Sequence, residues 1–337
     1  MSNKPPIEVP QGAIRLNTDS QKLEFFAQDR WYEMATDVPT LDGGSRGLIM
    51  GGSYSSPGPG THNQITFVTI PTEGDSTDFG DLTHTTRDGG SCASRTRGLY
   101  RFGTGPGDIN DNVDFVEIAT TGNAQDFGDM TYNARGTEGL SSQTRGIFFN
   151  GDDDGSPRTR FNTIDFVTIS STGNGIDFGD RDVSASKPTG GSSPTRGIML
   201  GSHTSPYLQI DFITIATTGN SQDFGESVRT STRTSGACST TRMVYGGSLD
   251  PLGTIDYLTI ATTGSSVAFG DMTVNRASFA AMSDCVRAVF AGGDGHPAQF
   301  SEIDYVNIAT EGNAVDFGDL PYDNQQCTGC SNGHGGL

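Results

Sequence analysis

The chain has 337 residues, of which 33% are hydrophobic and 47 are glycine, and its formal net charge is −19. An acidic surface repels phosphates and anionic lipids, which argues against a nucleic-acid partner and against membrane insertion. No apolar run reaches the length of about 18 residues that a membrane-spanning helix needs. The many glycines favour short strands joined by tight turns.

The first 44 residues differ from the rest of the chain. Residues 1–12 are polar and proline-rich, and we expect an extended arm. The next residues predict a three-stranded β-meander with strands at 13–17, 22–26 and 31–34. So short a meander cannot bury a core alone. We therefore interpret residues 13–44 as a docking module and linker, with docking residues Trp31, Phe25 and Phe26.

From residue 45 onward one pattern recurs six times. A strand with the pattern Ile-Asp-aromatic, or a close variant, is followed by a turn that reads Thr-Gly-Asn or a relative of it, and then by Asp-Phe-Gly-Asp or a close variant. The six phenylalanines of this last motif are separated by 48, 51, 46, 45 and 48 residues, and they are Phe79, Phe127, Phe178, Phe224, Phe269 and Phe317. A period in this range indicates a solenoid, an array or a propeller.

Each repeat contains four segments that we expect to form short strands. An arginine opens an apolar strand, a variable loop follows, and the two strands of the pattern come next. A segment of small residues, such as 89–94, then precedes the next arginine, and four strands in about 45–50 residues are typical of a propeller blade. The arginines are Arg46, Arg97, Arg145, Arg196, Arg242 and Arg287.

The two ends of the repeat region complement each other. The first repeat lacks a small-residue strand of its own, and residues 324–331 carry that pattern after the last repeat. We therefore predict that 324–331 pair with 46–52, so that residues 45–337 form an all-β, six-bladed propeller of four-stranded blades. Closing the ring in this way removes an exposed sheet edge.

The order of strands resembles that of kelch-like propellers over residues 45–331. The pairs Gly51-Gly52, Gly246-Gly247 and Gly292-Gly293 fit the kelch di-glycine, whereas Phe-Gly stands where kelch repeats commonly carry tryptophan. The resemblance implies the architecture and no particular kelch protein.

A second resemblance concerns the amino-acid sequence of the repeats. The run Ile-Asp-Tyr/Phe-Val-Thr-Ile-Ala-Thr-Thr-Gly-Asn is similar to repeats in structural proteins of marine bacteriophages, notably cyanophages. The segment from Gly12 to Trp31 looks like a short module near the start of phage tail, fibre and other virion proteins. Together they imply a virion component, attached through its N-terminal module and assembled in the host cytoplasm. The first residues lack the apolar segment of a signal peptide, which agrees with that location.

Two motifs suggest chemistry and are better explained by the repeat. Asp-Phe-Gly is also a kinase metal-binding motif, but here it recurs once per repeat without the other kinase motifs, and we expect its phenylalanine to pack between blades. Cys327 and Cys330 are spaced like a redox or zinc pair, but Cys92 and Cys238 occupy equivalent strands alone. We expect all four cysteines to serve packing.

The charged repeats leave alternatives open. One arginine per blade could form an anion-binding ring, although pairing with a nearby carboxylate, such as the aspartates of the Ile-Asp-aromatic strands, is favoured. Those aspartates are Asp114, Asp165, Asp211, Asp256 and Asp304. The acidic loop Asp152, Asp153 and Asp154 is a weak candidate for a Ca²⁺ site, with a solvated loop as the favoured interpretation. No other metal or cofactor and no catalytic residue is predicted.

The sequence therefore predicts a non-enzymatic virion structural protein for display, adhesion or decoration. Its partners would be other virion proteins through residues 1–44, with a host glycan or receptor on the variable loops; a homo-oligomer stays open. One alternative is a carbohydrate-active propeller enzyme, which an inward-facing carboxylate pair in one or two blades would favour. The other is a cellular kelch-type scaffold.

Overall fold

The computed structural model describes residues 10–17, 22–28, 30–33, 45–54, 60–105, 108–203, 205, 207–248, 253–295 and 298–337. The chain divides into two compact units, Met1–Leu41 and Asp42–Leu337. Every regular element in the described residues is a β-strand. Within these residues there is accordingly no helix with the length and apolar character for crossing a bilayer. Most of the predicted arm and linker lies outside the described residues.

The smaller unit is a three-stranded antiparallel sheet. Its strands are β1 (Ile14–Asn17), β2 (Lys22–Ala27) and β3 (Arg30–Glu33), in the order β1-β2-β3. The predicted meander is therefore present, with each strand within a residue or two of its expected position.

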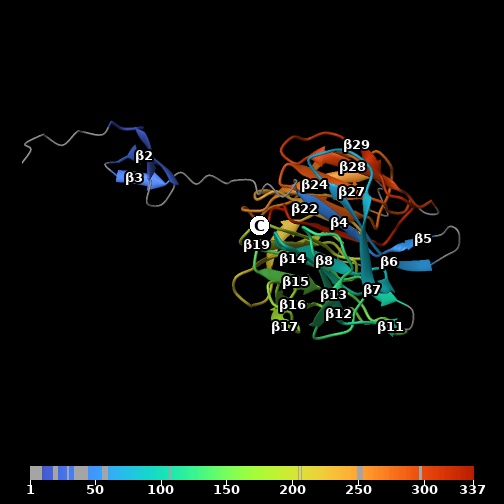
Figure 1. Cartoon of the computed structure of the whole chain (residues 1–337). Coiled ribbons are helices and arrows are strands. Elements are labelled where there is room, and N and C mark those ends of the chain that lie inside the picture. The colour runs from blue at the N-terminus through green and yellow to red at the C-terminus, as the bar shows by residue number, and fades with distance from the viewer. Residues whose placement is uncertain are drawn as a thin grey trace, which may run out of the picture. The chain divides into compact units, whose positions relative to one another are not determined.

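The larger unit consists of antiparallel sheets in a propeller-like arrangement (Figure 1). Each sheet has a first, second, third and fourth strand, as the repeat predicts. The first strands, rich in small residues, are β8 (Gly90–Ala93), β14 (Glu138–Ser141), β18 (Thr189–Ser192), β22 (Ser235–Cys238), β26 (Ala280–Ser283) and β30 (Thr328–Ser331). The arginine-initiated second strands are β4 (Arg46–Met50), β9 (Arg97–Arg101), β15 (Arg145–Phe149), β19 (Arg196–Leu200), β23 (Arg242–Gly246) and β27 (Arg287–Ala291).

The third and fourth strands form a hairpin in each sheet. The third strands are β6 (Gly60–Thr69), β12 (Asn112–Glu117), β16 (Thr163–Thr168), β20 (Gln209–Thr214), β24 (Thr254–Thr259) and β28 (Glu302–Asn307). The fourth strands are β7 (Thr77–Thr86), β13 (Gln125–Asp129), β17 (Ile176–Asp180), β21 (Gln222–Glu226), β25 (Val267–Asp271) and β29 (Val315–Asp319). Short strands β5 (Ser53–Tyr54), β10 (Thr104–Gly105) and β11 (Asp108–Ile109) lie in loops.

The C-terminal strand joins the first sheet, as predicted. β30 pairs antiparallel with β4, with Thr328 opposite Met50 and Ser331 opposite Gly47. Each first strand also contacts the first strand of the next sheet, and β30 contacts β8. Segments from both ends of the repeat region therefore share one sheet.

A β-bulge lies at the same place in every third–fourth hairpin. In the second sheet Val113 is opposite Gly128 while Asp114 is opposite Asp126, so Phe127 is the extra residue. A bulge re-aims a side chain out of the alternating pattern. Phe127 is 2% exposed and packs edge-on against Phe115 at a centroid distance of 5.9 Å.

The apolar core is divided into six clusters, each shared by two neighbouring sheets. The cluster around Phe79 joins the first sheet, including Cys330, to Tyr100 and Ile118 of the second, and the cluster around Phe317 joins the last sheet to Ile49 and Ile70 of the first. Phe127, Phe178, Phe224 and Phe269 lie in the other four clusters. The prediction that these phenylalanines pack between sheets is confirmed.

Candidate functional site

The repeated arginines tie neighbouring sheets together. Each guanidinium lies over the aromatic ring of its own third strand, with centroid distances of 4.2 to 4.9 Å. Each Nη1 also donates a hydrogen bond of 2.9 to 3.3 Å to a carbonyl oxygen of the next sheet. The acceptors are Ile118, Ile169, Ile215, Ile260, Ile308 and Ile70, in the order of the arginines.

The expectation that these arginines pair with the third-strand aspartates is wrong. Where an arginine of this set has a carboxylate partner, it is a glutamate: Arg97 lies 2.7 Å from Glu117, and Arg287 lies 3.5 Å from Glu73. The planar guanidinium stacks on the aromatic ring with its face and donates hydrogen bonds to carbonyl oxygens with its edge, so it is well satisfied without a carboxylate.

The aspartates instead accept bonds from the preceding sheet. Thr83 donates its backbone N–H to Asp114 at 2.8 Å, and Thr131 donates to Asp165 at 2.9 Å. In the third sheet Asp182 stands at the position of the threonine, and the residue before it makes the contact: Nε of Arg181 lies 2.6 Å from Asp211, with both side chains buried. The remaining partners are Arg229 for Asp256, and Thr273 and Arg276 for Asp304.

The Phe-Gly dipeptides make a third contact between sheets. The carbonyl oxygen of each motif phenylalanine accepts from the N–H of the glycine in the next Thr-Gly turn, at 2.7 to 3.1 Å. The glycine after the phenylalanine touches that turn: a Cβ on Gly128, whose φ is +143°, would lie 2.7 Å from the backbone of Gly173. The bond between Gly74 and Phe317 links the first repeat to the last in the same way.

The acidic loop is held by protein groups. Asp152 and Asp154 both pair with Arg135, at 3.1 and 2.7 Å. Oδ1 of Asp153 accepts backbone bonds from Thr159 and Gly155, and the bonds from Thr159 lower the pKa of Asp153. Among the described residues, no group of three or more His, Cys, Asp or Glu is placed to hold a metal ion.

The docking residues do not share one face of the small sheet. The register places Phe25 opposite Tyr32 and Ile14, and these three form one face; Phe26 and Trp31 pair on the other. Arg15 covers the Trp31 ring at 4.1 Å. Phe25 is 37% exposed and Ile14 64% exposed, so the more open apolar face is the one without Trp31.

The cysteines are packing residues. Cys327 and Cys330 are both free and buried, and they belong to different core clusters on the two sides of β30. Burial raises the pKa of each thiol to about 12, so neither is a thiolate at neutral pH. The packing interpretation is confirmed.

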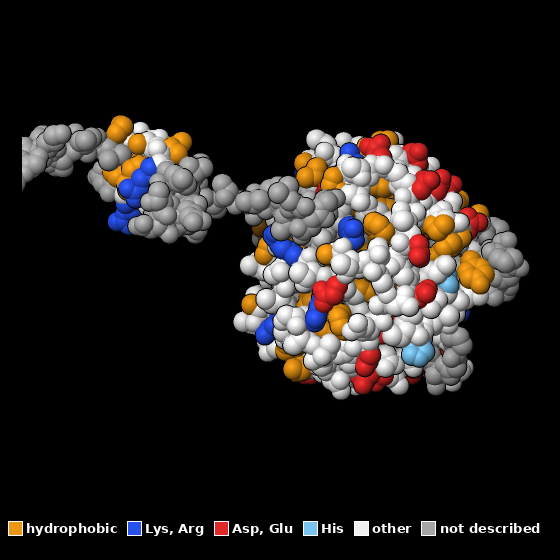
Figure 2. All heavy atoms as spheres, in the orientation of Figure 1, with side chains coloured by type: hydrophobic (Ala, Val, Ile, Leu, Met, Phe, Trp, Pro, Cys, Tyr) orange, Lys and Arg blue, Asp and Glu red, His pale blue; other side chains and the backbone are white. Residues whose placement is uncertain are grey.

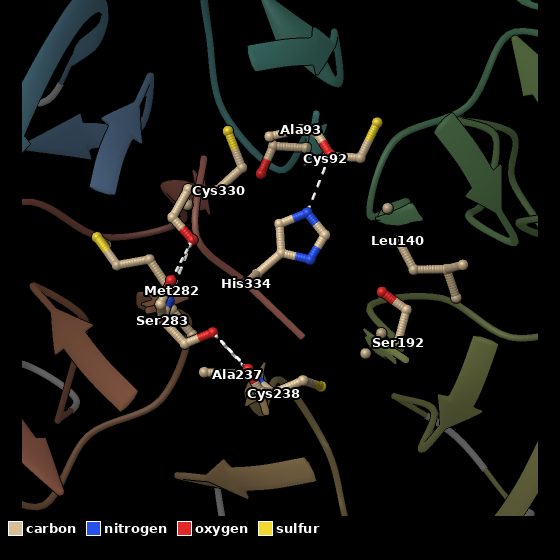
Figure 3. A pocket seen from close by; sticks show the side chains of 18 of the residues that line it. Cys92, Ala93, Leu140, Ser192, Ala237, Cys238, Met282, Ser283, Cys330 and His334 are labelled. Atoms are coloured by element: carbon tan, nitrogen blue, oxygen red, sulfur yellow. Dashed lines mark hydrogen bonds between the residues drawn. The ribbon is translucent and has the colours of Figure 1, made fainter. Parts of the chain in front are cut away.

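The first strands surround two small cavities, one towards each end. We call the cavity of about 60 Å³ towards their C-terminal ends the tail cavity, because His334 enters it (Figure 3). The Nε2 atom of His334 lies 2.9 Å from the carbonyl oxygen of Ala93, while Nδ1 accepts from the N–H of Gly336. Burial lowers the pKa of His334 to about 4, so the ring is neutral.

At the other end, a girdle of left-handed residues precedes the first strands. It consists of one residue from each repeat, with φ between 53° and 59°: Asp88, Gly136, Lys187, Arg233, Ser278 and Gln326. Five backbone bonds run between successive members, from the N–H of Gly136 to Asp88, Lys187 to Gly136, Ser278 to Arg233, Gln326 to Ser278 and Asp88 to Gln326, at 2.7 to 3.0 Å. Such a conformation is costly for a residue with a side chain, and the bonds hold it in place.

The girdle residues line a cavity of about 50 Å³, which we call the girdle cavity. Its charges break the repeat, because only some sheets contribute them. Lys187 Nζ lies 2.5 Å from Asp88 Oδ1, and both residues line the cavity. Glu138 also lines the cavity, and burial raises its pKa to about 8.

Sequence reasoning missed this site. The six girdle positions share a backbone conformation but no residue type, so no motif marks them. Each girdle residue lies the same number of residues before a small-residue strand, and this constant spacing is the sequence signal that could have identified them.

The acidic residues do not gather on the visible face. Asp and Glu are spread over the larger unit in Figure 2, which agrees with a general role in solubility.

Comparisons with known proteins add no assignment: no protein-family model matches the sequence, and no curated protein is significantly similar to it.

Proposed function

We propose that the chain is a non-enzymatic structural protein of a bacteriophage particle, in which a closed six-bladed, kelch-like propeller is displayed and residues 1–44 attach it to other virion proteins. The display role is carried by one observation. The arginine, aspartate and Phe-Gly contacts recur between successive sheets, and the arginine and Phe-Gly contacts also link the last sheet to the first. A frame so joined keeps its shape while its loops vary.

The closed ring has support beyond the pairing of β30 with β4. The core cluster around Phe317 contains Ile49 and Ile70, and Arg287 donates to the carbonyl oxygen of Ile70. These contacts have the same form as those between sequence neighbours. The virion assignment rests on the resemblance of the repeats and of the N-terminal module to phage structural proteins.

The test is mass spectrometry of gradient-purified phage particles, with the copy number per particle. Stoichiometric presence supports the proposal: a few to tens of copies would indicate the tail or fibres, and hundreds would indicate capsid decoration. Absence from particles together with presence in the lysate would overturn it and favour the cellular scaffold.

The loops between second and third strands are the proposed recognition surface for a host glycan or receptor. The loop 151–160 is braced by Arg135 and by the bonds to Asp153, whereas 55–59 and 249–252 lie outside the described residues. Replacing 151–160 and 248–253 with Gly-Ser segments of equal length should abolish binding to host cells. Unchanged cell binding would rule this surface out.

One observation favours the second candidate, a carbohydrate-active enzyme. Asp88 and Glu138 both line the girdle cavity and occur in single repeats, and Glu138 has the raised pKa of a general acid. The ion pair with Lys187 occupies Asp88, which weakens this candidate. Release of reducing ends from host polysaccharide by the wild type, lost in Glu138→Gln, would establish the enzyme.

A further inference from the structure

We propose that the girdle cavity binds the carboxylate group of a small ligand, with Arg233 as its ionic partner and Thr137 and Ser278 as hydrogen-bond donors. This site lies among the first strands and not on the variable loops. It does not depend on the virion assignment.

The first support is a set of polar atoms without partners. Among the described residues, Nε of Arg233, Oγ1 of Thr137 and Oγ of Ser278 are buried and make no hydrogen bond. All three residues line the girdle cavity, and Thr137 is only 3% exposed. A buried donor left unpaired is destabilising, and a ligand that accepts its hydrogen bond recovers that loss.

The neighbouring polar side chains already have hydrogen-bond partners, so the donors without a partner are confined to a few residues of the cavity wall. Oγ1 of Thr189 lies 2.5 Å from Oγ1 of Thr234, and Ser235 donates to the carbonyl oxygen of Phe279. The unpartnered donors therefore belong to a subset of the cavity wall, contributed by Thr137, Arg233 and Ser278.

The balance of charge selects an anion. Lys187 and Asp88 neutralise each other at 2.5 Å, which leaves the guanidinium of Arg233 without a carboxylate partner in the cavity wall. Glu138 carries little negative charge at neutral pH, because burial raises its pKa to about 8. The cavity is thus locally cationic within a protein whose net charge is −19.

The size of the cavity selects a small group. A volume of about 50 Å³ accommodates about three or four water-sized atoms, and a carboxylate has three heavy atoms. Gly136 lines the cavity and adds no side chain to it. A larger ligand would enter by its carboxylate and leave the rest outside, as an acidic sugar would.

The experiment is isothermal titration of the full chain with glucuronate, with acetate and with glucose as the uncharged match to glucuronate. The variants are Arg233→Gln, Thr137→Val and Ser278→Ala. Arg95→Gln removes the same charge from an exposed residue outside the cavity and outside the variable loops, and is the control. Thermal unfolding of each variant verifies that it folds.

We expect glucuronate to bind and glucose not to bind. Arg233→Gln should weaken binding by about tenfold or more and Thr137→Val by a smaller factor, with Arg95→Gln unchanged. Binding of acetate alone also supports the site and identifies a free small acid as its ligand, whereas binding of glucuronate alone identifies an acidic sugar. The proposal is overturned if no carboxylate binds, if glucose binds equally well, or if Arg233→Gln and Thr137→Val both leave the affinity unchanged.

Discussion

Lys187 reaches across one whole repeat to meet Asp88, with its Nζ 2.5 Å from Oδ1 of the carboxylate. The girdle member between them is Gly136, which has no side chain to obstruct the pair. Both charged side chains are largely buried, at 16% and 12% exposure. The pair therefore links sheets that are not neighbours.

The first prediction concerns this pair. Lys187→Met should lower the free energy of unfolding by about 1–3 kcal/mol, because it leaves Asp88 buried and unpaired. Adding Asp88→Asn should restore part of that loss. Urea denaturation of the two single variants and the double variant measures the coupling. Strictly additive losses would mean that the pair contributes nothing.

The second prediction concerns the stacked arginines. Arg145→Lys keeps the charge but loses the planar group that lies 4.6 Å from the Phe166 ring centroid and donates to Ile215. We expect a loss of about 1 kcal/mol, against no measurable loss for the exposed Arg158→Lys. Equal midpoints in a denaturant titration of the two variants would contradict this role.

The third prediction uses two glycines with similar φ and different surroundings. Gly128→Ala places a Cβ 2.7 Å from the backbone of Gly173, whereas Gly173→Ala meets nothing within 4 Å. Both carry the cost of a positive φ, so their difference isolates the clash between sheets. We expect Gly128→Ala to be less stable than Gly173→Ala by about 2 kcal/mol in thermal unfolding, and comparable stabilities would refute the close contact.

The fourth prediction concerns Glu138 and pH. Burial raises its folded-state pKa from 4.5 to about 8, so its protonated form favours folding below pH 4.5 and that contribution is lost as the pH rises towards 8. Glu138→Gln should therefore gain roughly 1–3 kcal/mol over the wild type at pH 8 and little at pH 4.5. The exposed Glu226→Gln serves as control, and a pH-independent difference would contradict the burial of charge.

The fifth prediction concerns His334, whose effect on stability depends on pH in the opposite direction to that of Glu138. Burial lowers the pKa of His334 from 6.5 to about 4, so its contribution is present above pH 6.5 and is lost as the pH falls towards 4. Thermal unfolding between these pH values should show the wild type losing stability more steeply than His334→Gln. Parallel pH profiles would mean that the histidine is not enclosed in the tail cavity.

The sequence by itself determined the repeat, the order of the four strands and the pairing of the C-terminal strand with β4. It also determined that the motif phenylalanines and the cysteines pack in the core. These features are local patterns of apolar and small residues, which repeat in register with the strands and can be read without knowing what lies opposite.

Only the tertiary structure decided the partners of the polar groups. The arginines bond to carbonyl oxygens about 70 residues away or further, and a carbonyl group leaves no trace in residue identity. The register of the small sheet separated Phe25 from Trp31, because side chains one residue apart point to opposite faces. The girdle cavity likewise depends on backbone conformation and on juxtaposition across the sheets, so its unpartnered Arg233 became visible only when the sheets were assembled.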